Sequence, residues 1–110
     1  MRSLFIGRWQ PFHKGHKALI DTALLRGKDV LIAVRMTGVD EKNPFTYEER
    51  VAKIREIYPD EEKVKIIPID DIDEVLYGRD VGYSVKKVEL PQEIEEISAT
   101  KIRNDYLDRG

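Results

Sequence analysis

The sequence contains no cysteine among its 110 residues. This absence excludes disulfides, a thiolate nucleophile and a cysteine-ligated metal site. No apolar run approaches the roughly 20 residues that a membrane-spanning helix requires. The first apolar run begins at Leu4, directly after Met1, Arg2 and Ser3, so no secretory leader is expected. We therefore expect a cytoplasmic protein that does not bind membranes.

An excess of positive charge is also missing. Lys and Arg number 19 against 21 Asp and Glu, which gives a formal net charge of −2. A general nucleic-acid-binding surface requires a basic excess, so no nucleic-acid partner is expected and any site for a polyanion must be local. The length suits one compact domain over residues 1–110 with a modest core.

The apolar pattern that is present predicts an α/β domain. Residues 4–6 and 30–34 are apolar runs typical of buried strands, and residues 17–26 repeat apolar side chains at helical spacing. A strand, a helix and a strand in this order form a βαβ unit with parallel strands. Gly27 is the expected C-terminal stop of the first helix. Thr46 and Glu49 predict a capping box at the start of a second helix, which Pro59 ends.

Three further strands are expected at residues 64–69, 75–77 and 84–90, and a last helix at residues 99–107. Together these elements predict a mostly parallel, five-stranded sheet with flanking helices in a single compact domain. Only residues 78–83 connect the last two strands, whereas a parallel crossover needs a dozen residues or more. Three interpretations stay open: a helix reduced to a turn, an antiparallel fifth strand, or different strand boundaries.

The turn at residues 7–16 contains both histidines of the chain. It lies between a strand and a helix, where backbone N–H groups at the positive end of the helix dipole favour an anion. His13 and His16 are three residues apart and can share a face. Two imidazole donors can stabilise charge that grows on phosphate oxygens. The alternatives are a metal pair, for which no third ligand is evident, and two unrelated surface histidines.

A second cluster of side chains suited to phosphate lies at residues 97–103. Ser98 and Thr100 supply hydroxyls at a helix start, and Arg103 offers its planar fork one turn later. Alone, this segment is better interpreted as an ordinary Ser-capped amphipathic helix with a solvated arginine. Together with the histidine turn, it predicts the other end of a polyphosphate site.

Two loops follow strand ends, at the edge of a parallel sheet where ligands bind. Lys42 follows the second strand and Gly78-Arg79-Asp80 follows the fourth, so both can approach a phosphate chain. A solvated loop and a plain turn are equally open alternatives. Trp9 and Phe12 either pack in the core or stack on a base. The acidic run at residues 70–73 is interpreted as a solvated turn and not as a metal cluster.

The two clusters together resemble the motif blocks of a known family. Residues 7–16, GRWQPFHKGH, resemble its G-x-x-x-P-x-H-x-G-H block, and residues 97–103, ISATKIR, resemble its I-S-x-T-x-x-R block. These two blocks define the HxGH nucleotidyltransferases, also called the cytidylyltransferase-like superfamily. They stand at opposite ends of the chain and bracket nearly all of it.

The resemblance implies a Rossmann-like fold and the transfer of a nucleoside monophosphate to a small phosphate-bearing acceptor. The acceptor's phosphate oxygen attacks the α-phosphorus in line and pyrophosphate leaves, without a covalent enzyme intermediate. Mg²⁺ is the implied cofactor, carried on the nucleoside triphosphate, with no metal site on the protein. With Lys42 added from its place after the second strand, the predicted catalytic residues are His13, His16, Lys42 and Arg103. The implied nucleotide-binding residues are Gly7, Arg8, Trp9, Gln10, Phe12, Gly15, Gly78, Arg79, Asp80, Ile97, Ser98, Thr100 and Arg103.

Within the superfamily, the first block resembles the G-R-F-Q-P-F-H form of nicotinamide-mononucleotide adenylyltransferases, with Trp9 in place of Phe. Residues 43–50 resemble their N-P-F-T-x-x-E-R segment, and Gln10 stands where cytidylyltransferases have aspartate. ATP is therefore the favoured nucleotide. The chain is shorter than those adenylyltransferases, however, and Gly78-Arg79-Asp80 stands where small glycerol-phosphate-type cytidylyltransferases carry G-D-D.

The acceptor of the transferred nucleotide is consequently left open by the sequence. One alternative is a cytidylyltransferase that uses CTP and a polyol phosphate. A second alternative is a nucleotide-binding module without turnover, motivated by the short connection at residues 78–83. Because members of this family often assemble and the core is small, we expect a homo-oligomer.

Overall fold

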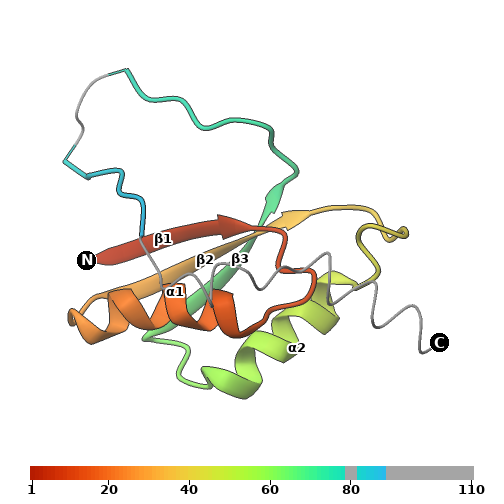
Figure 1. Cartoon of the computed structure of the whole chain (residues 1–110), viewed down its shortest axis with the longest axis horizontal. Coiled ribbons are helices and arrows are strands. Elements are labelled where there is room, and N and C mark those ends of the chain that lie inside the picture. The colour runs from red at the N-terminus through yellow and green to blue at the C-terminus, as the bar shows by residue number, and fades with distance from the viewer. Residues whose placement is uncertain (79–81, 89–110) are drawn as a thin grey trace.

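The structure is a computed structural model, and it describes residues 1–78 and 82–88. Strands and helices alternate along the described chain (Figure 1). Their order is β1 (Arg2–Gly7), α1 (Lys14–Leu25), β2 (Asp29–Met36), α2 (Tyr47–Ile57) and β3 (Val64–Asp70).

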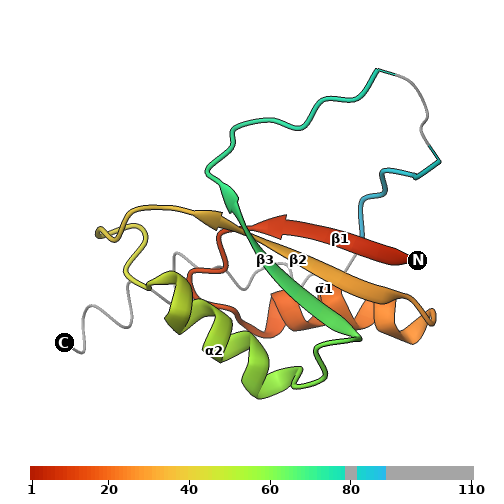
Figure 2. The same cartoon turned by 180° about the vertical axis from the view of Figure 1, so that it is seen from behind.

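The three strands form one parallel sheet in the order β1-β2-β3. Leu4 lies opposite Leu31, and Leu31 lies opposite Lys65 on the other side. The predicted parallel βαβ unit is confirmed. Both helices lie on the same side of the sheet in Figure 1, and the view from behind in Figure 2 shows the same arrangement.

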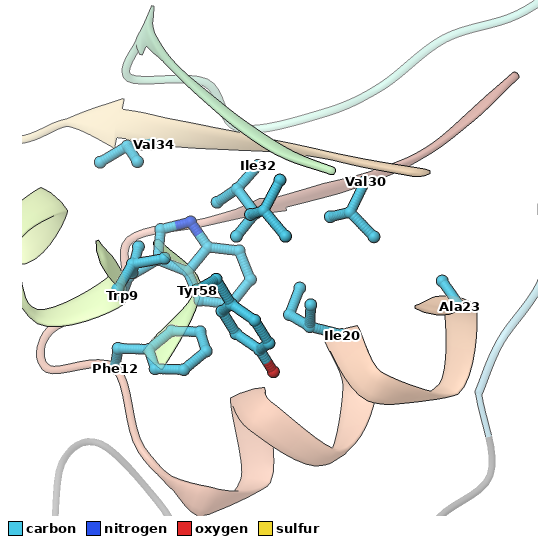
Figure 3. Close-up of a cluster of buried hydrophobic side chains, with 10 residues drawn as sticks. Trp9, Phe12, Ile20, Ala23, Val30, Ile32, Val34 and Tyr58 are labelled. Atoms are coloured by element: carbon cyan, nitrogen blue, oxygen red, sulfur yellow. The ribbon is translucent and has the colours of Figure 1, made fainter. Parts of the chain in front are cut away.

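The core lies between the sheet and these two helices (Figure 3). Val30, Ile32 and Val34 alternate along β2 and are fully buried, as expected for β-branched residues on the covered face of a strand. Ile20 from α1 and Ile54 from α2 belong to the same core on the helix side of the sheet and are also fully buried. The second helix thus reaches the core at Ile54.

Both helices are closed by local hydrogen bonds that the sequence predicts. Gly27 has φ +77°, and the N–H groups of Gly27 and Lys28 donate to the carbonyls of Leu24 and Ala23. This pair of bonds is a Schellman motif, which needs a left-handed residue after the helix and therefore favours glycine. At the start of α2 the predicted capping box between Thr46 and Glu49 is confirmed in both directions.

The first helix begins three residues earlier than the apolar pattern predicts. Its range is Lys14–Leu25, and His13 is its N-cap. Histidine is not among the residues that usually cap helices, so the sequence pattern gives no signal for this start. The consequence is that both histidines belong to the first turn of α1 and its cap.

Two of the predicted strands are not strands in the described residues. Residues 75–77 are irregular and their side chains are largely exposed, with Leu76 at 78%. Residues 84–88 are irregular as well, and residues 89–90 of that predicted strand lie outside the described part. A strand needs a neighbour for its backbone groups, and the six-residue connection between these two segments is too short for a crossover that would place them in one parallel sheet. The described residues after β3 instead form a long loop that leaves the sheet on the side away from the helices, and its blue part returns toward the start of β1 (Figures 1 and 2).

The predicted last helix at residues 99–107 lies outside the described residues. In the part of the chain that the structure describes, no helix is long and apolar enough to cross a membrane.

The close contact between the backbone of Gly7 and the ring of Trp9 gives a stability prediction. A Cβ atom placed on Gly7 would lie 3.0 Å from Cε2 of Trp9, whose ring is held in the core. We expect Gly7→Ala to lower the free energy of unfolding by about 1–3 kcal/mol because the indole cannot move aside. Urea denaturation measures this change. Gly38→Ala is the matched control, since no atom lies within 4 Å of its Cβ position. Equal denaturation midpoints for the two variants would contradict the prediction.

Candidate functional site

His13 and His16 form a capping box made of two imidazoles. The backbone N–H of Gly15 donates to Nδ1 of His13 at 3.0 Å, and the backbone N–H of His13 donates to Nδ1 of His16 at 3.2 Å. The two rings are stacked, with centroids 3.7 Å apart and planes inclined by 21°. The histidines therefore close the amino end of α1 and lie side by side at its positive pole.

These hydrogen bonds fix which nitrogen of each ring carries the proton. A ring nitrogen that accepts a hydrogen bond has no proton, so each neutral imidazole carries its proton on Nε2. Burial, and to a smaller extent the neighbouring His13, lowers the pKa of His16 to about 3. Burial also lowers the pKa of His13. The site thus presents two neutral Nε2–H donors, a pair suited to phosphate oxygens.

Trp9 and Phe12 form the floor beneath this pair. Their side chains are 4% and 2% exposed, and the Trp9 ring meets the His16 ring edge-on at 4.7 Å. Trp9 has φ +54°, which is rare for a residue with a side chain, and its indole N–H donates to the carbonyl of Ala33 at 3.1 Å. Both aromatic side chains are in the core (Figure 3), so stacking on a base, one of the two interpretations above, is wrong for them.

Gln10 links the histidine turn to the loop before α2. Its side chain is 1% exposed, and its amide oxygen accepts from the backbone N–H of Phe45 while its amide nitrogen donates to the carbonyl of Phe45. The same nitrogen donates to Thr37 at 3.3 Å. Gln10 therefore acts like one rung of a sheet ladder, and its side chain holds the turn in place instead of reaching a ligand.

Arg8 and Lys42 come from different loops and lie at the same edge of the sheet. Nη1 of Arg8 donates to Oδ1 of Asn43 at 3.4 Å, next to Lys42 in the sequence. Oδ1 of Asp40 accepts from the backbone N–H groups of Lys42 and Asn43, so this loop is shaped from within. Hydrogen bonds from Asn43 are the largest of the effects that lower the pKa of Asp40. Both cations thus stand at the carboxyl ends of β1 and β2, where a parallel sheet binds ligands.

Two residues in this arrangement were not predicted as site residues. Asn43 holds Arg8, and the buried guanidinium of Arg50 donates to the backbone carbonyl of Arg8 at 2.8 Å. Both belong to the N-P-F-T-x-x-E-R segment, so the resemblance contained the signal. Arg50 also lies on the apolar stripe of α2, four residues before Ile54, where a charged side chain is unexpected.

Several predicted site residues are outside this geometry. Gly78 is exposed on the segment after β3, and no contact between it and the histidine turn is found among the described residues. Arg79, Asp80 and the whole of residues 97–103 lie outside the described residues, and with them Ile97, Ser98, Thr100 and Arg103. Among the residues that are described, no three His, Cys, Asp or Glu side chains are grouped to hold a metal ion.

The lowered pKa values of the histidines predict how stability depends on pH. The unfolded chain binds protons on both rings below about pH 6.5, whereas the folded chain keeps His16 neutral and binds a proton on His13 less readily than the unfolded chain does. The free energy of unfolding should therefore fall as the pH falls, and we expect a loss of about 1–2 kcal/mol between pH 7 and pH 5. Urea denaturation at both pH values measures it. In the variant His16→Asn the amide oxygen replaces Nδ1 and does not titrate, so an undiminished pH dependence in that variant would contradict the assignment.

Comparisons with known proteins identify the family of this chain. Residues 4–94 match the family described as Cytidylyltransferase-like. A nicotinamide-nucleotide adenylyltransferase from Ignicoccus hospitalis is 45% identical over 66% of this chain and 46% of its own length. One from Methanococcus maripaludis is 32% identical over 98% of this chain and 79% of its own length. The chain thus spans less than half of the first relative. The second alignment is 139 positions long and this chain has 110 residues. At least 29 aligned positions (139 less 110) therefore have no counterpart in this chain.

Among solved structures, a bifunctional NMN adenylyltransferase/ADP ribose pyrophosphatase from Francisella tularensis superimposes with a TM-score of 0.58 and 39% identity. The match covers 64% of this chain and 22% of that protein, which was crystallised with AMP and a manganese ion. The predicted α/β, Rossmann-like fold is confirmed by this likeness and by the parallel sheet. The chain belongs to the cytidylyltransferase-like family of HxGH nucleotidyltransferases, and its motifs are those of the nicotinamide-nucleotide adenylyltransferases.

Proposed function

We propose that this chain is an adenylyltransferase. It transfers AMP from ATP to a small phosphate-bearing acceptor, and nicotinamide mononucleotide is the favoured acceptor because the relatives described above carry that name. An oxygen of the acceptor's phosphate attacks the α-phosphorus of ATP, the bond from that phosphorus to the bridging oxygen breaks, and pyrophosphate leaves. No bond to the protein forms at any point.

The observation that carries the proposal is the pair of neutral Nε2–H donors at the amino end of α1. The attacking phosphate oxygen is already ionised near neutral pH, so this reaction needs no general base. What it needs is positioning and stabilisation of charge on the phosphate oxygens. His13 and His16 offer donors only, because their other ring nitrogens already accept from backbone N–H groups.

The cations at the same edge complete the proposed roles. Arg8 binds a phosphate of the nucleotide or of the acceptor, and Lys42 neutralises the phosphate that is transferred. The loop that holds Lys42 next to Asn43, and Asn43 against Arg8, supports this assignment. A planar guanidinium and a compact ammonium can share one phosphate group from two directions. Gly7 and Gly15 contribute backbone only: Gly7 leaves room for Trp9, and the N–H of Gly15 is the one bound by His13.

The residues proposed to bind the rest of the triphosphate lie almost all outside the part of the chain that the structure describes. Ser98, Thr100 and Arg103 hold the β- and γ-phosphates, with Ile97 preceding them and Gly78, Arg79 and Asp80 nearer the nucleoside. The motif in the sequence supports this part of the proposal.

We also propose that Mg²⁺ enters the site on the triphosphate. The described residues offer cations and imidazole donors and no cluster of three metal ligands, a set that suits a metal carried by its substrate. When bound, the ion neutralises charge on the phosphate chain. The manganese ion reported with AMP in the Francisella protein is consistent with a divalent metal in this family.

The assembly of the protein belongs to the proposal too. We propose that residues 1–110 form one domain, that the protein is a homo-oligomer, and that its complete sheet has further strands. Within the described residues β1 pairs on one side only, with β2, and this supports the last point.

Turnover of defined substrate pairs tests the proposed function. The complete chain is incubated with Mg²⁺ and ATP plus nicotinamide mononucleotide, and in parallel with CTP plus glycerol 3-phosphate. Pyrophosphate release and chromatography of the products report the reaction. A dinucleotide from the first pair alone is the expected result. Product from the CTP pair alone would favour the cytidylyltransferase. ATP binding without pyrophosphate release from any pair would favour the nucleotide-binding module, which the missing positions relative to the Methanococcus protein also motivate.

Two substitutions of His16 separate its two ring nitrogens. Asparagine places an oxygen near the position of Nδ1 and keeps the cap, whereas glutamine places an N–H near Nε2 and keeps the donor. We expect His16→Asn to stay folded and to lose about 10²–10³ in kcat, the usual effect of removing one preorganised donor. We expect His16→Gln to keep more activity and to lose about 1 kcal/mol of stability with the cap. Initial rates and urea denaturation of both variants measure this, and the opposite order would refute the role of Nε2.

A further inference from the structure

Arg50 is a charged residue inside the core. It lies on α2 and is 2% exposed. One nitrogen, Nη1, donates to the backbone carbonyls of Arg8 and Arg35, each at 2.8 Å, and Nε donates to the carbonyl of Thr46 at 3.2 Å. The guanidinium therefore joins three chain segments: the end of β1, the end of β2 and the start of α2.

The two carbonyls that share Nη1 have a special place in the sheet. The pairing of β1 with β2 ends at Gly7 opposite Val34, and Arg8 and Arg35 are the next residues on the two strands. At this point the pairing of β1 with β2 ends, whereas β2 stays paired with β3 through Arg35 opposite Ile69. The Arg35 carbonyl also accepts from the backbone N–H of Thr37 at 3.1 Å. Arg50 occupies the place of the missing rung, so its guanidinium sets how far apart the two strand ends stand.

Arg50 forms no ion pair in the described residues, where the ion pairs found are Lys17–Asp21 and Arg35–Asp71, and the charge of Glu48 opposes the effect of burial on its pKa only in part. Burial accordingly lowers its pKa. A buried charge is a poor way to gain stability, because an apolar side chain of similar volume often serves as well. The distinctive property of this guanidinium is geometric: one rigid group meets three fixed carbonyls.

We propose that Arg50 is a positioning residue for the phosphate site. It holds Arg8 through the backbone, while Asn43 holds the same residue through its side chain. Both the backbone and the side chain of Arg8 are thereby held in place, directly before the histidine turn in the chain. The proposal rests on the proposed function, in which Arg8 binds a phosphate.

The same helix contains a matched control. Nη1 of Arg55 donates to the backbone carbonyls of Tyr58 and Val64, at 3.1 and 2.7 Å. Arg55 thus makes a comparable bridge between two carbonyls, but at the start of β3, the opposite end of the sheet from the histidine turn. Loss of this bridge tests what a structural arginine of α2 contributes.

The experiment compares Arg50→Lys with Arg55→Lys in the complete chain. Lysine keeps the charge and loses the fork, so both variants should denature at lower urea concentration. We expect only Arg50→Lys to lower kcat/KM for ATP, by at least tenfold, with Arg55→Lys within twofold of the parent. Equal losses in the two variants, or full activity of Arg50→Lys, would overturn the proposal. If Arg50→Lys does not fold, Arg50→Met, which has no charge to bury, takes its place with the same expectation.

Trp9, the one tryptophan of the chain, gives a readout that needs no turnover. The Trp9 ring contacts the ring of His16, and Trp9 is the residue directly after Arg8 in the sequence. We expect Arg50→Lys to shift the emission of Trp9 and to weaken ATP binding at least tenfold, and Arg55→Lys to do neither. If the parent protein forms no product with any substrate pair, the proposed function fails. The emission and the ATP affinity then still decide the positioning role, and equal responses of the two variants would refute it.

Discussion

The separation of β1 from β2 is the constraint on which the site depends. Where two parallel strands part, their last backbone groups lose ladder partners and must find others, because unpaired buried groups are costly. Side chains supply those partners here: Arg50 takes the carbonyls of Arg8 and Arg35, and Gln10 pairs with both backbone groups of Phe45. The described structure leaves no buried side-chain nitrogen or oxygen without a partner. Side-chain hydrogen bonds therefore hold the ends of β1 and β2 in place where the two strands separate.

This arrangement divides the turn at residues 7–16 into two layers. The lower layer is structural, with Trp9, Gln10 and Phe12 buried against the sheet and the loop before α2. The upper layer consists of Arg8, His13 and His16, which remain partly accessible. A resemblance to a motif treats both layers alike, since every residue of the block is equally part of the pattern. The structure distinguishes the residues that are buried and shape the turn from those that remain accessible.

The fold was predictable from the sequence where local signals agree with burial. Apolar runs located β1, β2 and β3, and Thr46 with Glu49 located the start of α2. Gly15 marked the start of α1 to within one residue, but the role of His13 as its N-cap was not predictable, because histidine caps leave no familiar pattern. The run at residues 75–77 misled for another reason: apolar residues have strand propensity whether or not a neighbouring strand exists, and here their side chains are exposed. The role of Arg50 depends on where two strands separate, and no local window contains that information.

The capping box of imidazoles links helix formation to ligand binding through the rings themselves. Each ring accepts a backbone N–H at one nitrogen and carries its donor proton on the other. When an anion accepts a hydrogen bond from Nε2, electron density moves toward Nδ1, which then becomes a better acceptor; hydrogen bonds in such a chain strengthen one another. An anion bound to these rings would tighten the first turn of α1, so exchange of the amide protons of His13 and Gly15 with solvent would slow when the site is filled.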